Sequence, residues 1–365
     1  MDNLLNPNVL ELMPYKPGKP VEDIQREYHL EKVVKLASNE NPFQVPAIVV
    51  EAIKAEIANI NAYPDSNSFY LIQKLAQYNG IGEENVIVGA GSVELIRMII
   101  HAFLKPGETV LTSAKTFMFY RVATVETAGK SAYIEAPMGD DYTFDLDAMT
   151  KLMDHKTKII FLTNPNNPTG TMVSKQKIMA FINKVPEDKI IVLDNAYHEY
   201  VSDMDNYEEG IGEALQRKNL IVLRTFSKIY ALAGMRIGYA ISNPTIIGIL
   251  NRMKAPFNVT RIAQVAALAS LENDDFKIQS ATLNLKNKKK LFTQLTGMGL
   301  RTIPSEANFL LFLPQQDTNA LDRRLLQEGV IIRPVQSFGV PEGMRVTVGF
   351  EEDNDFFIEK LKKVI

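Results

Sequence analysis

A lysine with potential phosphate ligands beside it follows a buried strand of the predicted fold. Residues 219–223 form an apolar, β-branched run, and Thr225, Ser227 and Lys228 come directly after it. Arg236 stands eight positions beyond the lysine. Burial at a strand end lowers the pKa of an ammonium group and frees its lone pair, while hydroxyls and a guanidinium suit a phosphate group. This combination predicts a Schiff-base lysine and not a solvated surface lysine. Its partner would be a phosphate-bearing aldehyde cofactor, which is pyridoxal phosphate.

Two further stretches carry groups that such a cofactor needs. The pyridine ring of pyridoxal phosphate draws off electrons when its nitrogen is protonated, and a carboxylate beside the nitrogen maintains that proton. Asp194, in the segment LDNAYHEY at 193–200, ends an apolar run and suits this role, although it could instead cap the following turn. Asn167, in NPNNPTG at 164–170, could bind the cofactor or simply stabilise a turn.

A short glycine-containing turn offers a second phosphate-binding element. Gly91, Ser92 and Val93 lie where an apolar run at 86–89 meets a predicted helix at 92–104. The free N–H groups and the positive dipole end of a helix attract phosphate. Many strand–helix turns contain glycine, so this turn alone is a weak signal. Together with the hydroxyls and the guanidinium around the lysine, it predicts a complete phosphate cup.

The elements that position these residues follow an alternating rhythm. Short apolar, β-branched runs recur between helical stretches at 86–89, 110–113, 132–135, 158–163, 189–194, 220–225 and 237–241. This alternation predicts an α/β fold in which a mostly parallel seven-stranded sheet is sandwiched by helices. Asn167, Asp194 and Lys228 each fall at or just after the carboxyl end of a strand, where open α/β sheets bind ligands.

Beyond residue 254 the pattern changes to that of a smaller α+β unit. A long helical stretch over 258–298, interrupted near Asn273, precedes short strands and two helices. Arg333 and Arg345 lie on two of these strands and suit a doubly charged anion, or they could form surface salt bridges. We expect an N-terminal arm at 1–32 that packs with the small domain, a large cofactor-binding domain at 33–254 and a small C-terminal domain at 255–365.

The composition is that of an ordinary globular chain, with 365 residues and a net charge of −3. That charge gives no reason to expect nucleic acid or an anionic membrane as a partner. No apolar run reaches the length of a membrane span, and the N-terminus has no signal-peptide pattern. Cysteine is absent and the four histidines lie far apart, so we expect no metal site. A reducing compartment suits such a chain, and we expect a cytoplasmic location.

The motifs RTFSK, NPNNPTG and LDNAY together resemble those of the fold-type I pyridoxal-phosphate-dependent aminotransferases. The similarity covers nearly the whole chain, from Tyr15 to Arg345, and is strongest to the branch that acts on L-histidinol phosphate. It implies transfer of the amine from L-histidinol phosphate to 2-oxoglutarate, which gives imidazole-acetol phosphate and L-glutamate in histidine biosynthesis. An aromatic amino-acid aminotransferase is the alternative within the same chemistry. A decarboxylase or a non-catalytic binding protein would be a different class.

The resemblance also assigns roles to individual residues. Lys228 forms the Schiff base and moves protons, and Asp194 pairs with the ring nitrogen. Tyr197 and Asn167 bind the phenolic oxygen of the ring. Phe117 stacks on the ring, although its segment KTFMFY could equally pack in the core. The phosphate is held by Gly91, Ser92, Val93, Thr225, Ser227 and Arg236, and by Tyr63 from a second subunit, which implies a homodimer with shared active sites.

The resemblance further implies a substrate side that is built from both ends of the chain. In the family, the position of Arg345 binds the α-carboxylate of amino-acid substrates. In the histidinol-phosphate branch this place receives the substrate phosphate, with Arg333 beside it and a tyrosine that matches Tyr15. Asn41, in KLASNENPF, belongs to a segment that lines the substrate entrance. The chain departs from the usual pattern at Asn195, where the family shows glutamate, and at Val93, where it shows aspartate.

Overall fold

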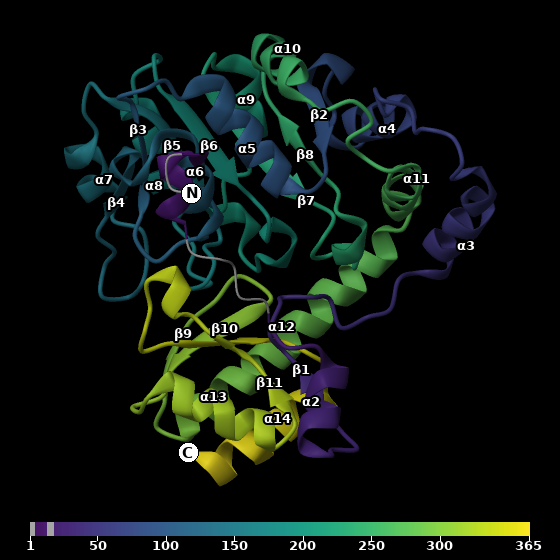
Figure 1. Ribbon diagram of the computed structural model, residues 1–365, viewed down its shortest axis with the longest axis vertical. Coiled ribbons are helices and arrows are strands. Elements are labelled where there is room, and N and C mark those ends of the chain that lie inside the picture. The colour runs from purple at the N-terminus through teal and green to yellow at the C-terminus, as the bar shows by residue number, and fades with distance from the viewer. Residues whose placement is uncertain (1–3, 13–17) are drawn as a thin grey trace.

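The apolar runs of the sequence form one sheet in the computed structural model, which describes residues 4–12 and 18–365 (Figure 1). The strand order is β2-β8-β7-β6-β5-β3-β4. β8 is antiparallel to both neighbours, and the other pairs are parallel. The predicted mostly parallel seven-stranded sheet is confirmed, with every run within one residue of its strand: β2 (Val86–Gly89), β3 (Thr109–Ser113), β4 (Tyr133–Ala136), β5 (Thr157–Thr163), β6 (Ile190–Asp194), β7 (Leu220–Thr225) and β8 (Gly238–Ile241).

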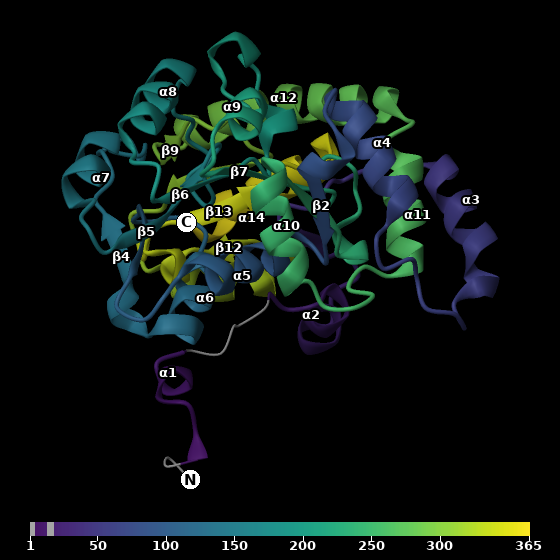
Figure 2. The same ribbon diagram turned by 90° about the horizontal axis from the view of Figure 1, so that it is seen from above.

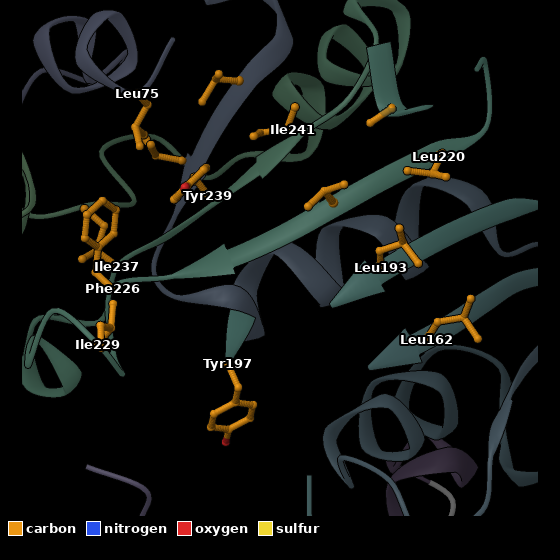
Figure 3. Close-up of a cluster of buried hydrophobic side chains, with 14 of the residues drawn as sticks. Leu75, Leu162, Leu193, Tyr197, Leu220, Phe226, Ile229, Ile237, Tyr239 and Ile241 are labelled. Atoms are coloured by element: carbon orange, nitrogen blue, oxygen red, sulfur yellow. The ribbon is translucent and has the colours of Figure 1, made fainter. Parts of the chain in front are cut away.

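Helices cover both faces of this sheet, as the alternating pattern predicted (Figure 2). One face packs against α5 (Ser92–Phe103), α6 (Phe119–Ala128) and α10 (Pro244–Met253). The other packs against α3 (Ala47–Glu56), α4 (Phe69–Asn79), α7 (Leu146–Leu152), α8 (Lys175–Lys184), α9 (Ile211–Gln216) and α11 (Arg261–Ser270). Figure 3 shows part of this second cluster, in which Tyr197 stands apart from the other labelled side chains.

The pleat of each strand decides which face a polar strand end meets. Along β6, Ile191 and Leu193 belong to the cluster under α8 and α9, whereas Ile190 and Val192 belong to the cluster under α5 and α6. Since side chains alternate along a strand, Asp194 falls on the α5–α6 face. The same parity places the last residues of β5 and β7 on that face too. The carboxyl edge of the sheet therefore presents a polar row toward α5 and α6.

A smaller unit follows, and the long helix α12 (Asp274–Gly297) leads into it from the large unit (Figure 1). The predicted interruption near Asn273 is confirmed, because its side chain caps α12 by accepting from the N–H of Phe276. The unit contains a four-stranded sheet of order β12-β13-β10-β9. Its elements are β9 (Arg301–Ile303), β10 (Phe309–Leu313), α13 (Thr318–Gln327), β12 (Arg333–Pro334), β13 (Met344–Thr347) and α14 (Glu351–Val364).

The N-terminal segment contacts both units. The short helix α1 (Pro7–Leu10) touches α6, and α2 (Val21–Tyr28) packs against α13. Strand β1 (Val34–Lys35) pairs in parallel with β11 (Val330–Ile331) of the small unit. The boundaries that we expected after residues 32 and 254 stay predictions. Within residues 4–12 and 18–365, no helix combines the length and the apolar composition that crossing a membrane requires.

Candidate active site

A cavity of about 300 Å³ opens where the carboxyl edge of the large sheet meets the small unit. Its walls contain most of the residues that the sequence singled out. Those from the large unit are Ser92, Val93, Phe117, Asn167, Asp194, Tyr197, Thr225, Ser227, Lys228 and Arg236, and those from the small unit are Arg333 and Arg345. The structure thus brings together residues that lie up to 253 positions apart in the sequence, from Ser92 to Arg345.

Lys228 occupies the middle of this set. Its amine donates to the carbonyl oxygen of Ser38 at 3.3 Å and lies 5.7 Å from the centre of the Tyr197 ring. Burial of the ammonium, with a further contribution from the positive charge of Arg345, lowers the pKa of Lys228 to about 8. An amine with this pKa is partly unprotonated at neutral pH and can act as a nucleophile.

A cup for an anion lies beside the lysine. The Arg236 guanidinium reaches the hydroxyl of Ser227 at 3.4 Å, and the N–H of Ser227 donates to the hydroxyl of Thr225 at 3.1 Å. Helix α5 begins at this point, and its N-cap residue Gly91 offers no side-chain hydrogen bond to the first N–H groups. Gly91 has a φ of +79°, and a Cβ there would stand 2.7 Å from Nη2 of Arg236. Glycine therefore keeps this cradle open for a ligand.

Asp194 is a buried carboxylate at the end of β6. Oδ2 accepts from the hydroxyl of Tyr120 at 2.6 Å, and Oδ1 accepts from the N–H of Ala196 at 3.2 Å. Burial raises the pKa of Asp194 to about 6, and these two hydrogen bonds oppose that rise. The backbone bond is the turn-capping contact that the sequence left open. Each oxygen accepts one of these two bonds, and an ionised carboxylate keeps further lone pairs with which it can meet a ligand.

Tyr197 and Asn167 both lie buried in the wall of the cavity. The hydroxyl of Tyr197 accepts from Nδ2 of Asn39 at 2.9 Å, and so its own proton can point elsewhere. Oδ1 of Asn167 accepts from Nη1 of Arg345 at 2.5 Å. Phe117 lies in the wall, whereas Tyr120 is fully buried behind it in an edge-to-face contact at 5.6 Å. Phe117 is therefore the aromatic of this segment that a ring in the cavity would meet.

Some expected residues lie elsewhere. The amide of Asn41 donates to the carbonyl oxygen of Ile229 at 2.8 Å and to the hydroxyl of Ser280 at 3.0 Å, outside the wall of the cavity. Tyr63 is 77% exposed and stacks on Phe257 at 4.5 Å, away from the cavity of its own chain. Tyr15 lies outside the described residues.

Sequence reasoning missed several residues that touch this set, among them Asn39 and Tyr120. Asn39 lines the cavity and holds Tyr197, two positions before the asparagine that we expected there. Its φ of +53° is a left-handed conformation that asparagine tolerates better than most residues. Tyr120 holds Asp194, and the pleat of β6 together with a helix over 119–128 could have indicated it. Asn195 donates to the carbonyl oxygen of Glu209 at 2.7 Å and is no part of the wall.

Taken together, the cavity fits a flat ring that carries an aldehyde, a phosphate and a basic ring nitrogen. The lysine amine can meet the aldehyde, the cup with its open glycine cradle can hold the phosphate, and Asp194 can face the ring nitrogen. On the side of the small unit, Arg333 and Arg345 add a cationic wall for a substrate anion. Such an arrangement can bind an amine substrate and move a proton at its α-carbon.

Comparison with known proteins points in the same direction. The family described as "Aminotransferase class I and II" matches residues 31–361. A histidinol-phosphate aminotransferase of Anaeromyxobacter sp. is 40% identical over 365 residues, covering 99% of each chain. A histidinol-phosphate aminotransferase 2 of Pasteurella multocida is 39% identical and covers 100% of this chain and 98% of its own.

Solved structures share the fold. A histidinol-phosphate aminotransferase from Sinorhizobium meliloti, in complex with pyridoxal-5'-phosphate, superposes with a TM-score of 0.88 at 24% identity, covering 99% of this chain and 98% of its own. An aspartate aminotransferase from Thermus thermophilus superposes with a TM-score of 0.82 at 22% identity and covers 99% of both chains. A family match over nearly the whole length and relatives at about 40% identity agree, and the chain belongs to the class I and II aminotransferases.

Proposed function

We propose that this enzyme uses pyridoxal phosphate to transfer the amine of L-histidinol phosphate to 2-oxoglutarate. One observation carries the proposal: the Lys228 amine, with its pKa lowered to about 8, lies in a single cavity with an anion cup and two arginines. The names of the relatives at about 40% identity support the choice of substrate. The cationic wall supports it too, because a substrate phosphate carries more charge than a carboxylate.

The residues around Lys228 fit each part of the cofactor. Thr225, Ser227 and Arg236, with Gly91 and the first turn of α5, would hold its phosphate. Asp194 would pair with the ring nitrogen, Asn167 and Tyr197 would bind the phenolic oxygen, and Phe117 would stack on the ring. When bound, pyridoxal phosphate supplies a ring that accepts the electron pair released at the substrate α-carbon.

The chain itself supplies the proton chemistry and the orientation. Lys228 takes the proton at the substrate α-carbon, and its lowered pKa matches that task near neutral pH. Arg333 and Arg345 would bind the phosphate of the amino donor and later a carboxylate of the incoming 2-oxo acid. The wall that both units share would exclude water while the proton moves.

We also propose that the enzyme is a homodimer with shared active sites. Tyr63 cannot serve the cavity of its own chain, because it lies exposed on Phe257. Around it, Ile60 and Phe257 leave apolar surface open to solvent, which a second copy would cover. Tyr63 would then reach the cofactor phosphate of the partner. The location that we propose is the cytoplasm, which a chain without cysteine suits.

A panel of half-reactions tests the substrate. The protein is loaded with pyridoxal phosphate, and the loss of its near-ultraviolet or visible absorbance is followed after addition of L-histidinol phosphate, phenylalanine or tyrosine. We expect L-histidinol phosphate to react with the highest kcat/KM. Equal or faster reaction of the aromatic amino acids would instead support an aromatic amino-acid aminotransferase. Release of carbon dioxide from an amino acid would indicate a decarboxylase.

A further inference from the structure

The carboxyl ends of β5 and β6 place two polar side chains next to each other beneath α6. Thr163 and Asp194 are the last residues of the two strands and are register partners. Tyr120 on α6 reaches both: its hydroxyl lies 2.8 Å from Oγ1 of Thr163 and 2.6 Å from Oδ2 of Asp194. Its ring is fixed by stacking on Phe161 at 4.3 Å and by the edge contact with Phe117.

The direction of these hydrogen bonds follows from the chemistry of the groups. An ionised carboxylate can only accept, so Tyr120 must donate its proton to Asp194. The tyrosine oxygen then accepts from the hydroxyl of Thr163, which makes the chain Thr163 to Tyr120 to Asp194. Burial and the nearby carboxylate raise the pKa of Tyr120, so it remains a neutral donor. Such chains of donors strengthen one another in a buried site.

We infer that Tyr120 is a positioning residue that keeps Asp194 ionised and thereby keeps the shared proton on the pyridine nitrogen of the bound cofactor. This inference rests on the proposed function. The proton between a ring nitrogen and a carboxylate can lie on either atom. A hydrogen bond donated to the carboxylate stabilises the ionised oxygen, and the proton then stays on nitrogen. Without the tyrosine hydroxyl, the proton moves from nitrogen to Oδ2 or Oδ1, and a charged pair becomes a neutral one.

The burial of Asp194 makes this contribution necessary. Among the groups that act on this carboxyl, burial is the largest and favours the protonated form, and the hydrogen bond from Tyr120 is the largest that opposes it. The N–H of Ala196 is a weaker second donor at 3.2 Å. Tyr120 and Ala196 engage one carboxylate oxygen each, and an ionised carboxylate keeps further lone pairs for the cavity that Asp194 lines.

The test measures the ring nitrogen directly. Wild type, Tyr120→Phe and Asp194→Asn are each loaded with pyridoxal phosphate carrying ¹⁵N in the ring, and the nitrogen resonance is recorded. Tyr207→Phe is the matched control, because its buried hydroxyl donates to the main-chain carbonyl of Asn164 at 2.7 Å and does not line the cavity. If Tyr120 had only a structural role, Tyr120→Phe would lower the stability of the protein as Tyr207→Phe does, and the nitrogen resonance would not move.

We expect Tyr120→Phe to move the resonance from the protonated position of wild type toward that of Asp194→Asn, and Tyr207→Phe to leave it in place. The kcat should fall by roughly ten- to a hundredfold, as for a lost bond to a charged group, with a smaller change in KM. Thr163→Val removes the hydroxyl that donates to Tyr120 at the start of this row of hydrogen bonds. It should move the resonance in the same direction as Tyr120→Phe, but less. A Tyr120→Phe resonance that stays at the wild-type position, while that of Asp194→Asn moves, would overturn this inference alone. A wild type that binds no pyridoxal phosphate would overturn the proposed function with it.

Discussion

Arg345 of the small unit donates through Nη1 to Oδ1 of Asn167 in the large unit, at 2.5 Å. Nη2 of the same guanidinium donates to the carbonyl oxygen of Ala37 at 2.8 Å. A guanidinium only donates, so the amide of Asn167 must turn its oxygen to Arg345 and its NH₂ group away. Arg345 therefore orients Asn167, a proposed ligand of the cofactor, and also lines the cavity itself.

Replacement of Lys228 tests the centre of the site. We expect Lys228→Ala to abolish turnover, because the amine that attacks the cofactor aldehyde and moves the proton is gone. Borohydride treatment of the loaded wild type should leave a pyridoxyl group on the peptide that contains residue 228, as mass spectrometry would detect. A reduced adduct on another lysine would contradict the proposed role.

The lowered pKa of Lys228 predicts a pH dependence for cofactor capture. The amine attacks only when unprotonated, so the capture rate should rise with pH through about 8 and level off above it. The capture rate of a lysine with the ordinary pKa of 10.5 would keep rising up to about that pH. Stopped-flow absorbance of the cofactor-free protein mixed with pyridoxal phosphate measures the midpoint, and a midpoint near 10.5 would show that the cavity does not perturb this amine.

Replacement of Asp194 separates a catalytic carboxylate from a turn cap. Asp194→Asn keeps an oxygen that can accept from the N–H of Ala196, so the turn should survive. A neutral amide cannot keep the ring nitrogen protonated, and we expect kcat to fall by about a hundredfold or more, as electrostatic groups in active sites do. The dissociation constant for pyridoxal phosphate and kcat are measured together. A kcat of Asp194→Asn close to that of wild type would mean that Asp194 only caps the turn.

The shared site is tested with mixed dimers. A chain with Tyr63→Phe is co-expressed with a chain with Lys228→Ala, and the heterodimer is purified through two different tags. If Tyr63 acts across the interface, both lesions fall in one site and the other site is intact, so activity should equal half that of wild type. A heterodimer of Lys228→Ala with wild type is the control. Activity at only half that of the Tyr63→Phe homodimer, or a monomer in sedimentation, would contradict the shared site.

The large sheet could be predicted from sequence because its strands are buried on both faces. Such strands are continuous apolar runs, and the polar residue that ends each run marks the edge where a ligand binds. Asp194 and Thr225 end β6 and β7 in this way, and Lys228 follows β7 by three residues. These positions needed no knowledge of long-range contacts.

Other parts of the site depend on local conformation and on register, which the pattern of residue types does not encode. Asn39 and Asn41 are chemically identical and two residues apart, and only the left-handed backbone at Asn39 decides which one meets Tyr197. Phe117 could be separated from Tyr120 only once α6 was known to begin at Phe119. The contact of Tyr120 with Asp194 further required the pairing of β5 with β6 beneath that helix.

We expect the choice of substrate to depend on Arg333 and Arg345, which are register partners on the antiparallel strands β12 and β13. Residues directly opposite on such strands lie on one face, so both can reach a single anion, and both line the cavity. A phosphate carries between one and two negative charges and three acceptor oxygens, which two guanidinium groups can share. A carboxylate needs only one. We therefore expect Arg333→Gln to harm the reaction of L-histidinol phosphate far more than that of phenylalanine.

A lost bond between charged groups costs roughly 1.5–3 kcal/mol, so the ratio of kcat/KM for the two substrates should change by about ten- to a hundredfold in Arg333→Gln. Arg345→Gln should harm both substrates, because Arg345 also holds Asn167 and the carbonyl oxygen of Ala37. The measurement is kcat/KM for L-histidinol phosphate and for phenylalanine in wild type and in both variants. If Arg333→Gln lowers kcat/KM equally for the two substrates, the second guanidinium does not bind a group that only L-histidinol phosphate carries. The reason to prefer the phosphate substrate would then be gone.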